Sequence, residues 1–181
     1  MSDGDCGAGY LYDVSASASF CEGAACDIAG EAADKIACCI AQATCGDADG
    51  EGVSSESVSD SDCGSGLLYD PSASTLLCEG ATCDIDGVAA DKTACCVAQA
   101  SCGDSDGEGA GTASVTDDEC GTGYIYAPSS SALLCVDTAC NVAGVAADKA
   151  ACCVEQATCG DTDGAGAGSV SYTHLTLPTK A

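Results

Sequence analysis

The stretch ACCVAQASCGDSDGEG (residues 94–109) combines two adjacent cysteines, a third cysteine six residues later, and an acidic run rich in glycine. Close copies occur as ACCIAQATCGDADGEG (residues 37–52) and ACCVEQATCGDTDGAG (residues 151–166). Successive copies are 57 residues apart. A fixed period of this kind identifies a tandem array of repeats.

All eighteen cysteines of the chain follow this period, with six in each repeat. They are Cys6, Cys21, Cys26, Cys38, Cys39, Cys45, Cys63, Cys78, Cys83, Cys95, Cys96, Cys102, Cys120, Cys135, Cys140, Cys152, Cys153 and Cys159. About forty residues separate the first and last cysteine of a repeat, too few to bury a stabilising core unaided. Three disulfides in each repeat are therefore expected, which predicts an extracellular or secretory location.

The period divides the chain into repeats separated by acidic linkers. The predicted segments are a truncated linker at 1–5, repeats at 6–46, 63–103 and 120–160, linkers at 47–62 and 104–119, and a linker with a terminal tail at 161–181. Met1 occupies the place that Val58 and Val115 hold in the other copies. We therefore expect that upstream sequence, including a signal peptide, is missing.

Each repeat contains two short apolar runs around a turn-rich segment. In the second repeat the runs are residues 67–69 and 76–78, and Pro71 in the intervening DPSAS fixes the backbone at the start of a turn. This pattern predicts a β-hairpin. One aromatic position recurs in it, at Tyr12, Tyr69 and Tyr126. Its side chain is expected to be half-buried, with the hydroxyl at the edge of the core.

The second apolar run is followed by a segment rich in helix-forming residues. Residues 88–101 are predicted to form a helix capped by Gly103. On this helix Cys95 and Cys102 share one stripe, whereas Cys96 points about 100° away, so the adjacent cysteines are expected to bond different partners. The predicted fold is a small disulfide-rich α+β repeat, a β-hairpin plus one short helix stapled by three disulfides, present three times in tandem.

The spacing leaves the disulfide pairing open, because six cysteines allow fifteen pairings. We expect each repeat to be closed on itself, with the same pairing in every copy. In the second repeat the expected bonds join Cys63, Cys78 or Cys83 to Cys95, Cys96 or Cys102.

One pair of opposite charges recurs in the predicted helix, as Asp34–Lys35, Asp91–Lys92 and Asp148–Lys149. Neighbouring helix residues do not face each other, so each side chain is expected to find its own partner. We expect the Asp to accept a hydrogen bond from a backbone N–H near the helix start and the Lys to meet a surface acid.

The acidic linkers supply the one candidate binding site. DADGEG (residues 47–52) and DSDGEG (residues 104–109) place oxygens at alternate positions and glycine at the sixth, as in the first half of a calcium loop. The Glu required at the twelfth position is replaced by Val58 or Val115, so weak calcium binding and a solvated spacer both stay open. The candidate ligands are Asp47, Asp49, Glu51, Asp104, Asp106 and Glu108. No other cofactor is expected.

The composition argues against several classes of function. The repeats lack His, Arg and CxxC, so no zinc site, thioredoxin-like redox site or nucleophile–base pair is evident, and no enzyme is expected. A formal net charge of −25 argues against binding to nucleic acid or anionic membranes. No apolar run is long enough to span a bilayer, so membrane insertion is not expected.

The last residues depart from the repeat. SVSYTHLTLPTKA (residues 169–181) resembles translated sequencing-adaptor read-through, and residues 170–181 are set aside from functional argument. The one histidine of the chain, His174, lies there and is not taken as catalytic.

The motifs CGxGYLY, AADKxACC and QATCGDxDG recur on the cysteine pattern C-x14-C-x4-C-x11-CC-x5-C across residues 1–168. In these motifs the chain resembles the tandem cysteine-rich repeat proteins of dinoflagellate algae. The resemblance implies tandem repeats and a marine protist origin. No activity is assigned to that family, so the resemblance implies no catalytic or binding residues.

These features predict a non-enzymatic extracellular array with a structural, adhesive or coat role. Its expected partners are other extracellular or cell-surface proteins or glycans. Two alternatives stay open: a calcium-responsive binding array through the acidic linkers, and a protease inhibitor that presents the DPSAS loop.

Overall fold

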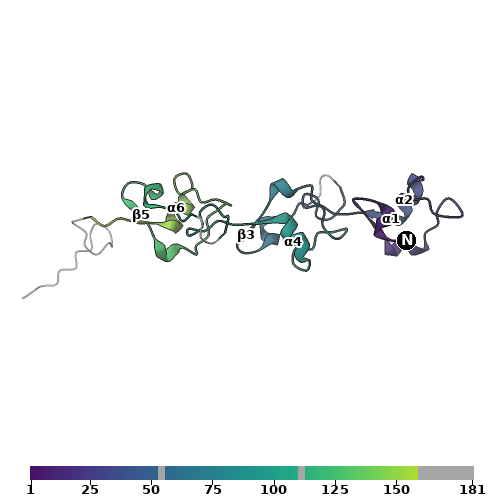
Figure 1. The fold of residues 1–181 in the computed structure, drawn as a ribbon, viewed down its shortest axis with the longest axis horizontal. Coiled ribbons are helices and arrows are strands. Elements are labelled where there is room, and N and C mark those ends of the chain that lie inside the picture. Colours follow the sequence, from purple (N-terminus) through teal and green to yellow (C-terminus); the bar gives the residue numbers. More distant parts are fainter. Residues whose placement is uncertain (53–55, 110–112, 159–181) are drawn as a thin grey trace, which may run out of the picture. The chain divides into compact units, whose positions relative to one another are not determined.

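The computed structural model describes residues 1–52, 56–109 and 113–158 (Figure 1). It divides into two compact units, Met1–Ala98 and Gln99–Ala181, and each is described by itself. Every repeat has the same order of elements: a one-turn helix, a strand, a 3-10 turn, a two-turn helix and a second strand. The repeated order follows from the repeated sequence.

The elements of the first unit are α1 Asp3–Cys6, β1 Tyr10–Tyr12, η1 Val14–Ala18, α2 Ala32–Cys38, β2 Cys39–Ala41, α3 Asp60–Cys63, β3 Leu67–Tyr69, η2 Pro71–Ala73, α4 Ala89–Cys95 and β4 Cys96–Ala98. Those of the second unit are α5 Asp117–Cys120, β5 Tyr124–Tyr126, η3 Pro128–Ser130, α6 Ala146–Cys152 and β6 Cys153–Glu155.

A capping box starts each one-turn helix. In α3 the side chain of Asp62 accepts a hydrogen bond from the backbone N–H of Ser59 at 2.8 Å, and the Ser59 hydroxyl donates to the same carboxylate at 2.6 Å. Such reciprocal bonds satisfy N–H groups that a helix leaves unpaired at its start. The helix ends at Cys63, which is thereby held at a fixed position in the repeat.

Each repeat contains a two-stranded antiparallel sheet and a short helix, which confirms the predicted fold class. The prediction that residues 76–78 form the second strand was wrong, however. β3 pairs with β4, in a register that places Leu67 opposite Ala98 and Tyr69 opposite Cys96. The second strand therefore comes after the helix, and Pro71–Ala73 form a 3-10 turn capped by Asp70.

The predicted helix at residues 88–101 is shorter than expected, because α4 ends at Cys95. Cys96 has φ −122° and ψ 141°, so the chain passes directly from helix into β4. The ladder with β3 supplies hydrogen bonds that replace those of a longer helix. Gly103 is consequently not a helix cap.

The buried side chains show that the packing unit is offset from the sequence repeat. The first cluster contains Ala43, Cys45, Val58, Cys63, Ala73, Cys78, Ile85 and Cys95. The second contains Ala100, Cys102, Val115, Cys120, Cys135, Val142 and Cys152. Each cluster thus begins before an acidic linker and ends after it. We call these packing units the modules at residues 43–98 and 100–155.

Eight disulfides join sixteen of the seventeen cysteines among the described residues, and Cys159 lies outside them. Three connect a one-turn helix to the second strand: Cys6–Cys39, Cys63–Cys96 and Cys120–Cys153. Three close a short loop: Cys21–Cys26, Cys78–Cys83 and Cys135–Cys140. Two join one sequence repeat to the next: Cys45–Cys95 and Cys102–Cys152.

The adjacent cysteines take different partners, as predicted, since Cys95 bonds Cys45 and Cys96 bonds Cys63. The expectation that each repeat is closed on itself was wrong. The last cysteine of a repeat crosses to the helix of the following repeat, because the chain before the linker packs into the next module. Independent beads on linkers are therefore replaced by modules that each combine parts of two sequence repeats and are closed by a disulfide between those repeats.

Candidate functional site

The joint between sequence repeats is the most elaborate feature of the fold. It consists of an arm, residues 42–48, and an acceptor face, residues 74–83 together with Cys95. The counterparts in the second unit are the arm at 99–105 and the acceptor face at 131–140 with Cys152.

Backbone hydrogen bonds hold the arm along the acceptor face. The N–H of Cys45 donates to the carbonyl of Leu76 at 3.0 Å, and the N–H of Cys78 donates to the carbonyl of Ala43 at 2.9 Å. Further along, the N–H of Cys83 donates to Ala48 at 2.8 Å. The arm therefore binds as an added strand would, through main-chain groups that most side chains could supply.

Two side-chain requirements make the arm specific. A side-chain carbon at Gly46 would lie 2.7 Å from the carbonyl oxygen of Ser74, so the close approach admits only glycine. The side-chain amide of Gln42 donates to the carbonyl of Cys78. The second unit repeats both features, since a side-chain carbon at Gly103 would lie 2.9 Å from the Ser131 oxygen.

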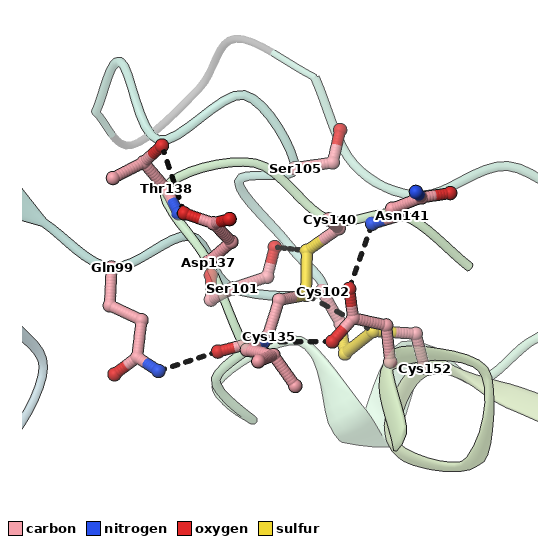
Figure 2. Close-up of a disulfide and its surroundings, with 12 residues drawn as sticks. Gln99, Ser101, Cys102, Ser105, Cys135, Asp137, Thr138, Cys140, Asn141 and Cys152 are labelled. Carbon is pink, nitrogen blue, oxygen red and sulfur yellow. Dashed lines mark hydrogen bonds between the residues drawn. A yellow bond between two sulfur atoms is a disulfide. The ribbon is translucent and has the colours of Figure 1, made fainter. Parts of the chain in front are cut away.

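Sulfur atoms fill the centre of the joint. Cys45 and Cys95 have no solvent exposure, and the sulfur of Cys78 lies 3.8 Å from that of Cys95. The bridge that fixes the arm thus lies against the Cys78–Cys83 bridge. That bridge lies in the loop of residues 78–84, which we call the acceptor loop. Figure 2 shows this arrangement in the second unit, where the Gln99 amide donates to the Cys135 carbonyl at 2.6 Å.

A buried carboxylate shapes the acceptor loop. Asp91 is 1% exposed and accepts hydrogen bonds from the N–H groups of Glu79 at 2.7 Å and Asp84 at 2.9 Å. The prediction that this Asp accepts a hydrogen bond from a backbone N–H is therefore confirmed. The N–H groups belong to the acceptor loop, however, and not to the start of the helix. Asp148 accepts the equivalent bonds in the second unit, from Val136 and Asn141.

The first repeat has the same carboxylate. The N–H groups of Glu22 and Asp27 each donate to Asp34 at 2.8 Å. These backbone hydrogen bonds, first from Glu22 and then from Asp27, hold the pKa of Asp34 below its ordinary value of 3.8. The carboxylate is therefore ionised when it orients the loop.

The lysine of the Asp–Lys pair contacts an aromatic ring rather than the expected surface acid. The ammonium of Lys35 lies 3.7 Å from the centre of the Tyr10 ring, and that of Lys149 lies 4.0 Å from the Tyr124 ring. Cation–π attraction stabilises both pairs. In the first and third repeats the sequence has a Tyr at the first strand position and a Lys 25 residues later, and this recurrence could have indicated the contact. In the second repeat Leu67 replaces the Tyr.

The recurring tyrosine of the strands behaves as expected. Tyr12, Tyr69 and Tyr126 are half-buried. Tyr69 packs against the first core cluster and Tyr126 against the second.

The acidic residues predicted to bind calcium accept hydrogen bonds from their own loop. Asp47 accepts from the N–H of Gly52 at 3.1 Å, and Asp49 accepts from the N–H of Glu51 at 3.1 Å. The second linker repeats this with Asp104 and Asp106, which accept from Gly109 and Glu108. The carboxylates thus form the turn itself, and calcium binding stays a prediction.

Three groups of converging ligand atoms occur among the described residues, and all are cysteine clusters. They are Cys21, Cys26 and Cys38; Cys45, Cys78 and Cys95; and Cys102, Cys135 and Cys152. A metal binds thiolates, whereas eight of these nine sulfurs are in disulfides. The remaining one, Cys38, is a buried thiol in the first repeat.

Within the part of the chain that the structure describes, the helices are too short and too polar to cross a membrane. No known family model matches the chain, and no curated protein or solved structure matches it. Function is therefore inferred from the joint, its two disulfides and the buried carboxylate that shapes it.

Proposed function

We propose that this protein is a non-enzymatic structural component of an extracellular array, in which the joints transmit tension from one repeat to the next. The observation that carries the proposal is the pair of inter-repeat bonds, Cys45–Cys95 and Cys102–Cys152. Both are buried, so small reductants reach them only when the modules open.

The bonds create a short covalent path through the protein. From Cys45 this path crosses to Cys95 and follows seven residues to Cys102, where the next inter-repeat bond begins. Fully extended, seven residues and one bridge span roughly 30 Å, whereas a whole repeat of chain would span roughly 200 Å. Tension along the array therefore bypasses most of each repeat and leaves its fold unloaded.

An extracellular setting agrees with the same chemistry. Sixteen cysteines in disulfides require an oxidising compartment. A net charge of −25 keeps such arrays hydrated and directs them toward cationic partners or cation-bridged glycans. The coat or adhesive setting of the array is part of the proposal.

Stretching single molecules held by their two ends tests the tension-bearing path. Between Cys6 and Cys152 the oxidised path contains thirteen residues and three bridges, so we expect a maximal length of roughly 60 Å, rising to roughly 500 Å after reduction. Unfolding steps of hundreds of ångströms in the oxidised protein would contradict the proposal.

A pair of variants isolates the inter-repeat bond. The double substitution Cys45→Ser with Cys95→Ser diverts the path through residues 45–63 and the Cys63–Cys96 bond, adding roughly 60 Å. The control Cys78→Ser with Cys83→Ser removes a bridge that lies off the path and should add no length.

A further inference from the structure

The first repeat has an acceptor face without an arm among the described residues. Residues 17–26 and Cys38 occupy the positions that residues 74–83 and Cys95 occupy in the next repeat. Cys95 and Cys152 are bonded to arm cysteines, whereas their counterpart Cys38 is a free thiol and only 5% exposed. The same position is therefore bonded in both copies that hold an arm.

Several main-chain groups of this face also lack partners among the described residues. In the modules at 43–98 and 100–155 the arm pairs with two N–H groups and with carbonyls of the acceptor face. The corresponding N–H groups of Cys21 and Cys26 and the carbonyls of Ser19 and Gly23 have no hydrogen-bond partner among the described residues. These groups resemble the exposed edge of a β-strand, which can pair with another extended segment.

Side chains of this face are also more exposed than their counterparts in the later repeats. Phe20 is 95% exposed, whereas its counterparts Leu77 and Leu134 are 47% and 43% exposed. Cys21 is half-buried, whereas Cys78 is 1% exposed. An arm covers these positions in the later modules and would cover them here.

The chain contains a third copy of the arm sequence. Residues 156–161 read QATCGD, identical to residues 42–47, which form the arm bound in the first unit. Cys159 stands where Cys45 stands, and Gly160 stands where the close approach requires Gly46. The side chains that recognise an acceptor face are therefore all present in this segment.

We propose that residues 156–161 of a second copy of this chain bind the acceptor face of the first repeat, and that Cys159 of that copy forms a disulfide with Cys38. This inference rests on the proposed structural function and names the partner that extends the array. Because the face lies in the first repeat and the arm sequence follows the third, copies joined in this way are linked head to tail.

The bond forms by oxidation of two thiols. The thiolate of Cys159 attacks one sulfur of a small-molecule disulfide and displaces one thiol, giving a mixed disulfide; Cys38 then attacks the Cys159 sulfur and displaces the second thiol. Two protein thiols are oxidised and one small disulfide is reduced to two thiols. Docking of the arm brings Cys159 to a thiol that is otherwise buried.

The test uses the full chain in a buffer of oxidised and reduced glutathione. We expect a concentration-dependent ladder of multimers on non-reducing gels, with Cys38 linked to Cys159 in peptide maps. Cys38→Ser and Cys159→Ser should each abolish the ladder, and their mixture should give a dimer that grows no further. A ladder retained in Cys38→Ser, or a Cys38–Cys159 bond within one copy, would overturn the proposal.

A glycine substitution separates specific docking from random oxidation. Gly160→Val keeps both thiols but blocks the close approach, so it should lower the yield of multimers at least about tenfold, whereas Gly168→Val should leave it unchanged. Equal yields for the two variants would contradict arm docking. The same peptide maps report Cys45–Cys95, so its presence without Cys38–Cys159 overturns this inference and leaves the proposed function standing.

Discussion

The buried Asp91 orders the acceptor loop by accepting hydrogen bonds from backbone N–H groups, as a capping residue does at the start of a helix. Asp91 gathers two N–H groups from a loop that has no regular secondary structure. A carboxylate is required because both of its oxygens accept, whereas an amide offers one acceptor and one donor. The loop that receives the arm is thus ordered by one side chain on α4.

Asp91→Asn should loosen this loop. The amide leaves one backbone N–H facing a donor, a loss of about 1.5–3 kcal/mol for a charged hydrogen bond in a buried position. Hydrogen exchange read by mass spectrometry should show faster exchange at Glu79 and Asp84. The exposed neighbour Asp86 provides the control, and Asp86→Asn should leave exchange unchanged. Identical exchange in both variants would mean that the loop is ordered by its disulfide alone.

Gly46→Ala tests the close approach of the arm. The added carbon would lie 2.7 Å from a backbone oxygen, which cannot move without shifting the acceptor loop. We expect a smaller fraction of Cys45–Cys95 after oxidative refolding, measured from peptide maps. Gly4→Ala is the matched control, because nothing lies closer than 3.8 Å to a carbon added there. Full recovery of the bond in Gly46→Ala would show that the arm tolerates a side chain.

At the scale of elements, charged caps hold the short segments. The Ser72 hydroxyl, and secondly its N–H, donate to Asp70 at the start of η2 and hold the pKa of Asp70 below 3.8. The same pattern lowers the pKa of Asp62 through the Ser59 hydroxyl and N–H. Elements of three and four residues have few other contacts of their own, so these caps matter to their order.

These caps predict acid sensitivity. Because the folded pKa of Asp70 is lowered, its contribution to stability is present above the unfolded value near 3.8 and is lost as pH falls through the folded pKa. Thermal unfolding followed by circular dichroism should show a constant Tm from pH 7 to about pH 5 and a decline below pH 4. Ser72→Ala removes the main cause of the shift and should make the decline smaller; an unchanged decline would assign acid sensitivity to other carboxylates.

The sequence was sufficient to predict the repeat and its content of sheet and helix, but not the second strand or the pairing of the cysteines. Periodicity and composition identified the repeat, the sheet-plus-helix content and the divergent partners of Cys95 and Cys96. They could not identify β4, because Cys96–Ala98 is three residues long and continues a helix-forming run. Strand pairing there depends on β3, which lies 27 residues earlier, and such pairing leaves little local signal.

The joint was missed for a related reason. A run of Gly, Asp and Ser around Gly46 is typical of a linker, so Cys45 was assigned to the repeat before it. The structure instead packs Ala43 and Cys45 into the next core. The one available signal was Gly46 itself, which is repeated in every copy without a turn that requires it.

At the scale of the whole molecule, sulfur replaces much of a hydrophobic core. Four of the eight buried residues in the first cluster are cysteines, and so are four of the seven in the second. We expect reduction to abolish the fold, because each long loop closed by a bridge contributes up to about 4 kcal/mol of unfolded-state entropy. Circular dichroism with and without a reductant measures this. Secondary structure that survived reduction to high temperature would show that the small apolar residues suffice.

The crossing of disulfides from one repeat to the next also decides how the chain survives cutting. Cutting any single peptide bond between Cys45 and Cys95 leaves both fragments attached through that disulfide. The same holds between Cys102 and Cys152. Between Cys6 and Cys152, only the six peptide bonds from Cys39 to Cys45 and the six from Cys96 to Cys102 separate the molecule when one of them is cut.

A protease specific for glutamate makes this visible. It has sites at Glu51 and Glu56 in one acidic run and at Glu108 and Glu119 in the other, all of them inside bridged loops. On a non-reducing gel the digest should keep the cysteine-containing fragments of residues 1–155 together and lose only the cysteine-free peptides 52–56 and 109–119. Once reduced, it should fall into small fragments. Repeats closed on themselves would instead separate at the first cut. Such an array can be nicked at many exposed loops by the enzymes of its surroundings and still remain one object.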